Sequence, residues 1–155
     1  MRANSKPERP RSVTLFSLGV LLLGGGLNLA RAAWAWRQAD ALTELPASTS
    51  MPMALLGATS LVWGVVFVAC SLGLWRLRPR ARTGTLVAVT LFHVHIWLNH
   101  AVFDRSDYAR QVWPFAVLHT LAALFFVWGF LYRSSIRRLY AEQGRMDGAC
   151  ESQAD

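Results

Sequence analysis

Four long apolar stretches, separated by shorter polar segments, dominate the hydropathy pattern of this 155-residue chain. They cover about residues 12–33, 53–75, 84–103 and 113–132, and the first contains no charged side chain before Arg31. A helix needs roughly 20 predominantly apolar residues to cross the hydrocarbon core of a bilayer. Because no water satisfies the backbone there, each stretch is expected to form a membrane-spanning helix.

The polar segments divide the chain into three parts. We predict a basic tail over residues 1–11, an all-α integral membrane four-helix transmembrane bundle over residues 12–140, and a disordered polar tail over residues 141–155. Residues 34–45 are expected to extend the first helix along the headgroups. Pro114 should lie at the first turn of the fourth span, where a missing backbone N–H costs nothing.

The amino-terminal stretch has a second interpretation. Residues 1–32 have a basic start, an apolar run and the small-residue pattern Ala30-Arg31-Ala32, which together are typical of a cleaved signal peptide. The apolar run is longer than the corresponding region of most signal peptides, which favours a retained span. Cleavage would leave three spans, with the orientation of the remainder unchanged.

Basic residues fall mainly on one side of the predicted membrane. Twelve of the 16 Lys and Arg residues lie in the amino-terminal tail, between the second and third spans, or after the fourth span. Cytoplasmic loops of membrane proteins carry an excess of Lys and Arg. We therefore predict an up-down-up-down bundle with both termini in the cytoplasm, in the cytoplasmic (cell) membrane of a bacterium.

Composition agrees with this location. Hydrophobic residues make up 54% of the chain and charged residues 16%, below the roughly 25% charged fraction of soluble domains. The net charge of +7 does not indicate a nucleic acid partner, because the basic residues lie between long apolar runs and not on a polar scaffold. The lipid bilayer is the partner that the composition predicts.

Several kinds of chemistry are disfavoured. The spans contain no Asp, Glu or Lys, whereas proton-coupled transporters usually place an acid in the membrane, so a small transporter is a weak alternative. Cys70 and Cys150 are far apart in the sequence and form no C-x-x-C pair, which argues against a thiol oxidoreductase. No nucleophile with a base at helical reach is evident, and we favour a non-enzymatic role.

Histidines are the main candidates for a cofactor site. All four lie in the third and fourth spans, namely His93, His95, His100 and His119. His95 and His119 are expected at similar depth on facing helices, as two axial ligands of haem b would be. A quinone or another pigment is a further alternative. The simplest interpretation is that the histidines form hydrogen bonds across helices, for example to Asn28, Thr90 or Thr120.

Small residues mark the helix-packing faces. Gly24 to Gly26 are consecutive, and pairs of small or short polar residues four positions apart recur in the first two spans: Gly24 and Asn28, Ser60 and Gly64, Ala69 and Gly73. Such pairs let two helices approach closely in a membrane. They predict contacts inside the bundle, or docking to another membrane subunit.

Two charged links are candidate binding surfaces. The outer link between the third and fourth spans is a candidate site for a protein partner, through Asp104, Arg105, Asp107, Tyr108 and Arg110. The link between the second and third spans is a candidate site for anionic lipid headgroups, through Arg76, Arg78, Arg80 and Arg82. Arginines in such a link also fix topology without binding a ligand.

The order of these features resembles small four-span bacterial integral membrane proteins without an assigned activity. The resemblance rests on the basic tail, the Gly-rich first span, the Arg-Pro-Arg-x-Arg link and the Ser-Asp-Tyr-Ala-Arg-x-x-Trp-Pro-Phe entry to the last span, residues 106–115. It implies architecture only. The small helix-packing residues, the absence of acids in the spans and the compact outer link lead us to expect an accessory or scaffold subunit of a larger membrane assembly. The alternative is a haem- or quinone-associated redox protein that uses His95 and His119.

Overall fold

The structure, a computed structural model, describes residues 10–39, 53–103 and 107–151, and every regular element in these ranges is helical. The elements are α1 (Arg11–Gly19), the π-helical segment η1 (Val20–Gly26), α2 (Leu27–Ala39), α3 (Met53–Trp75), α4 (Ala81–Phe103), α5 (Asp107–Tyr132) and α6 (Ser134–Glu151). Four stretches are long and apolar enough to cross a membrane: Arg11–Gln38, Met53–Trp75, Ala81–Val102 and Trp113–Tyr132. The all-helical fold and the four predicted candidate spans are thus confirmed.

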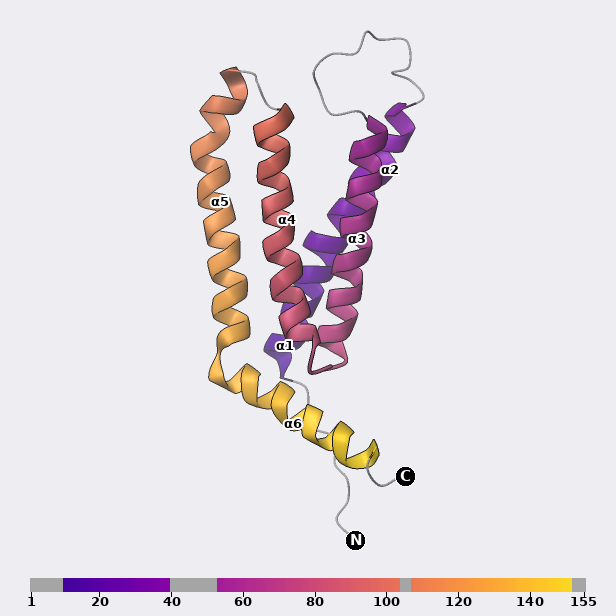
Figure 1. The fold of residues 1–155 in the computed structure, drawn as a ribbon, viewed down its shortest axis with the longest axis vertical. Coiled ribbons are helices and arrows are strands. Elements are labelled where there is room, and N and C mark those ends of the chain that lie inside the picture. Colours follow the sequence, from indigo (N-terminus) through magenta and orange to yellow (C-terminus); the bar gives the residue numbers. More distant parts are fainter. Residues whose placement is uncertain (1–9, 40–52, 104–106, 152–155) are drawn as a thin grey trace.

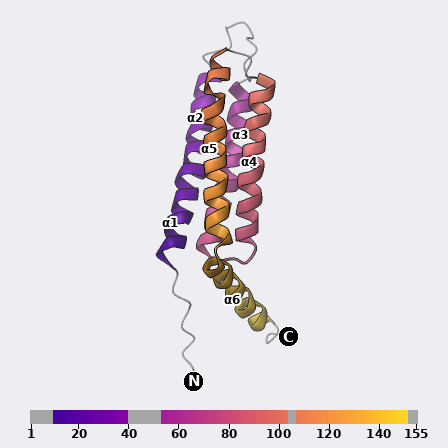
Figure 2. The same ribbon diagram turned by 90° about the vertical axis from the view of Figure 1, so that its left-hand side faces the viewer.

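The long helices lie side by side as a bundle of rods (Figure 1), and α6 leaves the lower end of the bundle at an oblique angle (Figure 2). We call this lower end the basal end. The turn between α3 and α4 lies there, as does Arg133, which separates α5 from α6. The first span is formed by α1, η1 and α2 without a break.

The closest helix pair is the first span against α3, and glycines allow the approach. A Cβ built on Gly24 would lie 2.7 Å from Cγ of Phe67, and one on Gly64 would lie 2.7 Å from Cδ2 of Leu29. Ala32 and Ala35 are almost completely buried along the same rod. The small residues therefore allow close contacts inside the bundle, which is the first of the two interpretations given above.

The three consecutive glycines end a π-helical segment that the sequence did not predict. Gly24 and Gly25 both approach α3, since a Cβ on Gly25 would lie 3.0 Å from Cγ2 of Val68. In a regular helix, neighbouring residues point about 100° apart. A π-helical turn inserts an extra residue into the spiral, and here it accompanies the close contact of two adjacent glycines with one partner helix.

A buried pair of serines joins the first span to α3 nearer the basal end. The Oγ of Ser17 donates to the carbonyl oxygen of Ser71, and the Oγ of Ser71 donates to the carbonyl oxygen of Ser17, each over 2.8 Å. Both side chains are almost fully buried. The pair thus places two reciprocal hydrogen bonds between helices where no water is available as a partner.

The basal end contains the main hydrophobic cluster, to which all four spans and α6 contribute. Its buried members, which we call the basal cluster, are Val13, Phe16, Leu74, Leu77, Leu86, Leu131, Ile136 and Tyr140. The ring of Phe16 stacks on that of Phe130, with centroids 4.2 Å apart. Packing is thus most complete at the basal end, and α6 is part of it.

Two features differ from the sequence expectation. The polar stretch after Tyr140, for which we expected no regular structure, continues α6 as helix to Glu151. Pro114 lies inside α5 and not at its first turn, because α5 begins at Asp107, before the apolar stretch starts. Hydropathy marks where a helix is apolar, whereas the helix itself continues into polar sequence that can still form its backbone hydrogen bonds.

Candidate functional site

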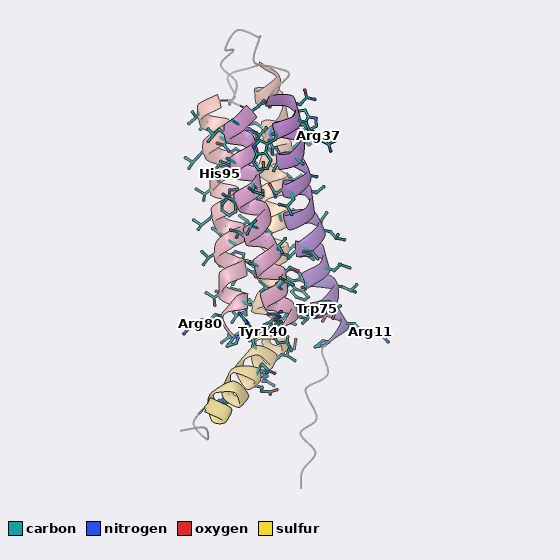
Figure 3. All side chains as sticks on the ribbon, turned by 90° about the vertical axis from the view of Figure 1, so that its right-hand side faces the viewer. Arg11, Arg37, Trp75, Arg80, His95 and Tyr140 are labelled. Carbon is teal, nitrogen blue, oxygen red and sulfur yellow. The ribbon has the colours of Figure 1, made fainter. Side chains whose placement is uncertain are left out.

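Basic side chains gather at the basal end. Arg11, at the start of the first span, and Arg80, in the α3–α4 turn, lie at the same end as Trp75 and Tyr140, whereas Arg37 lies toward the other end (Figure 3). Arg133, Arg137 and Arg138 follow α5 at the basal end as well. The structure therefore brings together basic segments that are far apart in the sequence.

The four candidate headgroup arginines of the α3–α4 turn are not equivalent. The Nε of Arg82 donates to the carbonyl oxygen of Leu131 over 2.8 Å, and its guanidinium carbon lies 5.0 Å from the centroid of the Tyr132 ring. Leu131 is in the last turn of α5, where carbonyls lack partners within the helix. Arg82 thus caps α5, while Arg76, Arg78 and Arg80 are exposed.

A groove lies between α3 and α4 and ends at this turn. We call it the α3–α4 groove; its volume is about 770 Å³. Its walls are almost entirely apolar, and Arg80 is the only charged residue among those that line it: Trp63, Val66, Cys70, Pro79, Arg80, Thr83, Gly84, Val87, Ala88 and Leu91. The sequence did not indicate this groove, because its two walls come from different spans.

His93 and His95 on α4 form hydrogen bonds within their own helix. Nδ1 of His93, which is buried, lies 2.8 Å from the carbonyl oxygen of Val89, to which it donates. Nε2 of His95 lies 2.9 Å from Nδ2 of Asn99. The ring of His95 packs toward α3, with its centroid 5.9 Å from that of Trp63. Nδ1 of His93 and Nε2 of His95 therefore have partners within α4. The ring contact with Trp63 orients His95 toward α3.

His95 and His119 do not share a cavity among those found in the described part of the chain. The cavity between α4 and α5, of about 310 Å³, is lined by His93, Trp97 and Thr120 but by neither member of the candidate haem pair. His119 is exposed on α5. The use of His95 and His119 as haem ligands stays a prediction.

Hydrogen bonds across helices differ from those we expected. Asn28 donates from Nδ2 to the carbonyl oxygen of Gly24 in its own helix, and Thr90 bonds the carbonyl of Leu86 in the same way. Trp97 makes one hydrogen bond between α4 and α5, since its Nε1 donates to Oγ1 of Thr120 over 3.2 Å. This role of Trp97 was not expected, because an indole in a span is more often an interfacial anchor.

The candidate protein-docking residues fall at the edge of the described structure. Asp104 and Arg105 lie outside the described residues. Asp107, Tyr108 and Arg110 belong to the first turns of α5, and their side chains are outside the described part. The docking role of this outer link stays a prediction.

The described residues contain no group of three or more His, Cys, Asp or Glu side chains placed to hold a metal ion. Every buried side-chain nitrogen or oxygen in the same ranges has a hydrogen-bond partner. No family model, curated protein or solved structure matches the chain.

Proposed function

We propose that this chain is a non-enzymatic accessory or scaffold subunit of a larger membrane assembly, and that α5 is the helix through which it associates. The observation that carries the proposal is the exposure of His119 on α5. Ionisable side chains within membrane spans almost always face protein or a water-filled cavity, because exposure to lipid is costly. A neighbouring protein that covers α5 would provide that environment.

The sparse packing of α5 supports the same surface. In the 18-residue apolar part of the span Trp113–Tyr132 only 6% is buried in the bundle, against 22–28% in the corresponding parts of the other three spans. Large side chains on this helix are highly exposed: Phe115, Leu118, Phe125 and Phe126 are each more than 60% accessible. Aromatic residues are enriched at protein interfaces, and this helix is the least buried of the four spans.

We further propose that the spans cross the bilayer in alternating directions, with both termini in the cytoplasm of a bacterial cell. The clustering of arginines at the basal end supports this orientation, because cytoplasmic segments carry the excess of Lys and Arg. Exposed aromatic residues near the helix ends, including Trp34, Trp75 and Tyr132, are placed as interfacial anchors. In a chain with Cys70 and Cys150 replaced by Ser, a cysteine introduced at either terminus should react with a membrane-impermeant thiol reagent only after the cell is permeabilised.

Site-specific photo-cross-linking in the membrane of the organism that encodes the chain tests the association surface. A photoreactive amino acid at Leu118 on α5 should give an adduct with a different protein, whereas the same group at Val62 on α3 should not. The two positions are similarly exposed, at 66% and 60%, so lipid exposure alone does not distinguish them. His119→Leu should reduce the adduct formed from Leu118, because it removes the polar group that the partner would accommodate.

The result that would contradict the proposal is equally specific. If both positions give the same adducts, or if Leu118 links only to lipid or to other copies of this chain, then α5 is not a surface for a different subunit. Mass spectrometry of the adducts distinguishes these cases.

A further inference from the structure

The α3–α4 groove has features of a lipid site, independent of any association through α5. We propose that it binds one acyl chain of an anionic phospholipid, whose phosphate is held by Arg80. The groove is apolar along its length and has one charged residue, Arg80, among its lining residues. The apolar walls of the groove suit the acyl chain of a phospholipid, and the single guanidinium of Arg80 suits its phosphate.

The arginine at the groove is distinguished from its neighbours by its surroundings. Arg82 is engaged with Leu131 and Tyr132, and neither Arg76 nor Arg78 lines the groove. Arg80 does line it and is exposed. A guanidinium binds phosphate oxygens through two parallel hydrogen bonds, which a free side chain at the mouth of the groove can offer.

The length of the groove agrees with one leaflet of a bilayer. On α4 the lining residues extend from Thr83 to Leu91, which at 1.5 Å rise per residue corresponds to about 12 Å, and Arg80 lies in the turn just before this helix. Half of the hydrocarbon core is roughly 15 Å. An acyl chain whose phosphate lies at Arg80 would therefore reach the level of Trp63 and Leu91 near the middle of the membrane.

Gly84 keeps the basal part of the groove open. A Cβ built on this residue would meet no atom within 4 Å, so a larger side chain there would fill the groove without displacing the backbone. Gly129, on α5, has the same open surroundings but does not line the groove. The two glycines form a matched pair in which only one substitution should affect a bound acyl chain.

Native mass spectrometry of the full-length chain in mild detergent tests the phosphate contact. Phosphatidylglycerol and phosphatidylcholine with identical acyl chains are added separately. Wild type should retain one phosphatidylglycerol in preference to phosphatidylcholine, and Arg80→Gln should reduce that preference about fivefold, as expected for one basic residue near an anionic headgroup. Arg76→Gln removes the same charge from the same turn and should leave the preference unchanged. Equal losses from both variants, or no preference in wild type, would overturn the proposal.

The acyl contact is tested separately. Gly84→Leu should abolish retention of both lipids, whereas Gly129→Leu should retain them as wild type does. Retention by Gly84→Leu at the wild-type level would show that the acyl chain lies elsewhere.

A third measurement uses only the wild-type chain and so does not depend on how a variant folds. Phosphatidylglycerol with a photoreactive diazirine in its acyl chain should cross-link mainly to residues 63–70 and 83–91. In the purified chain without a partner, the exposed face of α5 meets bulk lipid and provides an internal control. Cross-links spread evenly over α5 and the groove would refute a specific site.

Discussion

The hydroxyl of Tyr140 on α6 donates a hydrogen bond to the carbonyl oxygen of Leu74 on α3, over 3.1 Å. The same carbonyl accepts the backbone N–H of Leu77 in the α3–α4 turn. Tyr140 is 3% exposed, so an aromatic ring and a hydroxyl from α6 both pack against the end of the second span. This contact explains how a helix with a largely polar sequence is held against the bundle.

Removal of that hydroxyl should loosen α6 without unfolding the spans. A neutral hydrogen bond contributes about 0.5–1.5 kcal/mol, so Tyr140→Phe should raise the rate of tryptic cleavage after Arg137 and Arg138 by about two- to tenfold, if cleavage follows local opening. Tyr140→Ala should raise the rate further, because it also removes a buried ring. Cleavage that is unchanged in both variants would mean that α6 is not docked through Tyr140.

The cap that Arg82 provides for α5 should be measurable as stability. Hydrogen bonds with a charged donor contribute about 1.5–3 kcal/mol when buried. Since Arg82 is only partly buried, we expect Arg82→Met to lower the free energy of unfolding by about 1 kcal/mol. The exposed Arg78 is the control, and Arg78→Met should have little effect in the same detergent unfolding titration. Equal effects would indicate that general charge loss, and not the cap, is responsible.

The spans were predictable from sequence because hydropathy is a local property. The stretch 53–75 coincides with α3, and 84–103 and 113–132 each lie within a longer helix. The extra residues are polar turns at the amino-terminal ends of α4 and α5, which hydropathy does not detect. Helix α6 was missed for a related reason: a helix packed mainly through Ile136, Leu139 and Tyr140 has no continuous apolar run.

Candidate sites were harder to predict because they depend on pairs of helices. Nothing in the run Arg76–Arg78–Arg80–Arg82 tells which arginine bonds Leu131 and which lines the groove; that depends on where α5 ends beside α4. The expectation that histidines bond across helices failed for His93 and His95, since a carbonyl or amide one turn away in the same helix was within reach. Local partners are always available, whereas partners across helices require matching depth and rotation.

The buried serine pair should behave as one unit. Hydrogen bonds between membrane helices contribute about 0.6 kcal/mol on average and up to roughly 1.7 kcal/mol. Ser17→Ala and Ser71→Ala should each destabilise the protein by about this amount, and the double variant should lose about 1 kcal/mol less than the sum of the two. Ser17→Ala combined with Thr90→Ala is the control, and its effects should add because Thr90 bonds its own helix. Additive effects for Ser17 and Ser71 would show that the reciprocal bonds are not coupled.

Alanine substitution should have opposite effects on the stability of the bundle at two glycines, Gly64 and Gly129. Gly64→Ala should destabilise the bundle by about 1–3 kcal/mol, because its Cβ would be 2.7 Å from Cδ2 of Leu29 and 3.3 Å from the Leu29 backbone nitrogen. Leu29→Ala in the same chain should recover part of the loss. Gly129→Ala meets no atom within 4 Å and should be neutral or slightly stabilising, since Ala favours helix over Gly. Unfolding titrations that rank Gly64→Ala as neutral would contradict the close approach.

Two opposing effects on stability meet at Leu77, the cost of its left-handed backbone and the gain from burying its side chain, and substitutions can separate them. Its φ of 53° is the left-handed value that follows many helices, and the N–H of Arg78 bonds the carbonyl of Gly73 while that of Leu77 bonds Leu74, as in a Schellman motif. Glycine usually occupies this position, because a side chain there costs about 1 kcal/mol. Leu77 is nevertheless 6% exposed and belongs to the basal cluster, so burial of its side chain offsets the backbone cost.

Both Leu77→Ala and Leu77→Gly should therefore destabilise the protein, since truncation of a buried leucine costs about 2–5 kcal/mol. Their order should be unusual: Leu77→Gly should be more stable than Leu77→Ala by about 1 kcal/mol, because only glycine relieves the left-handed backbone. Leu86 is the matched control, a similarly buried member of the same cluster inside α4. There the order should reverse, with Leu86→Gly about 1 kcal/mol less stable than Leu86→Ala. If thermal unfolding of the four variants gives the same order at both positions, Leu77 does not adopt the left-handed conformation.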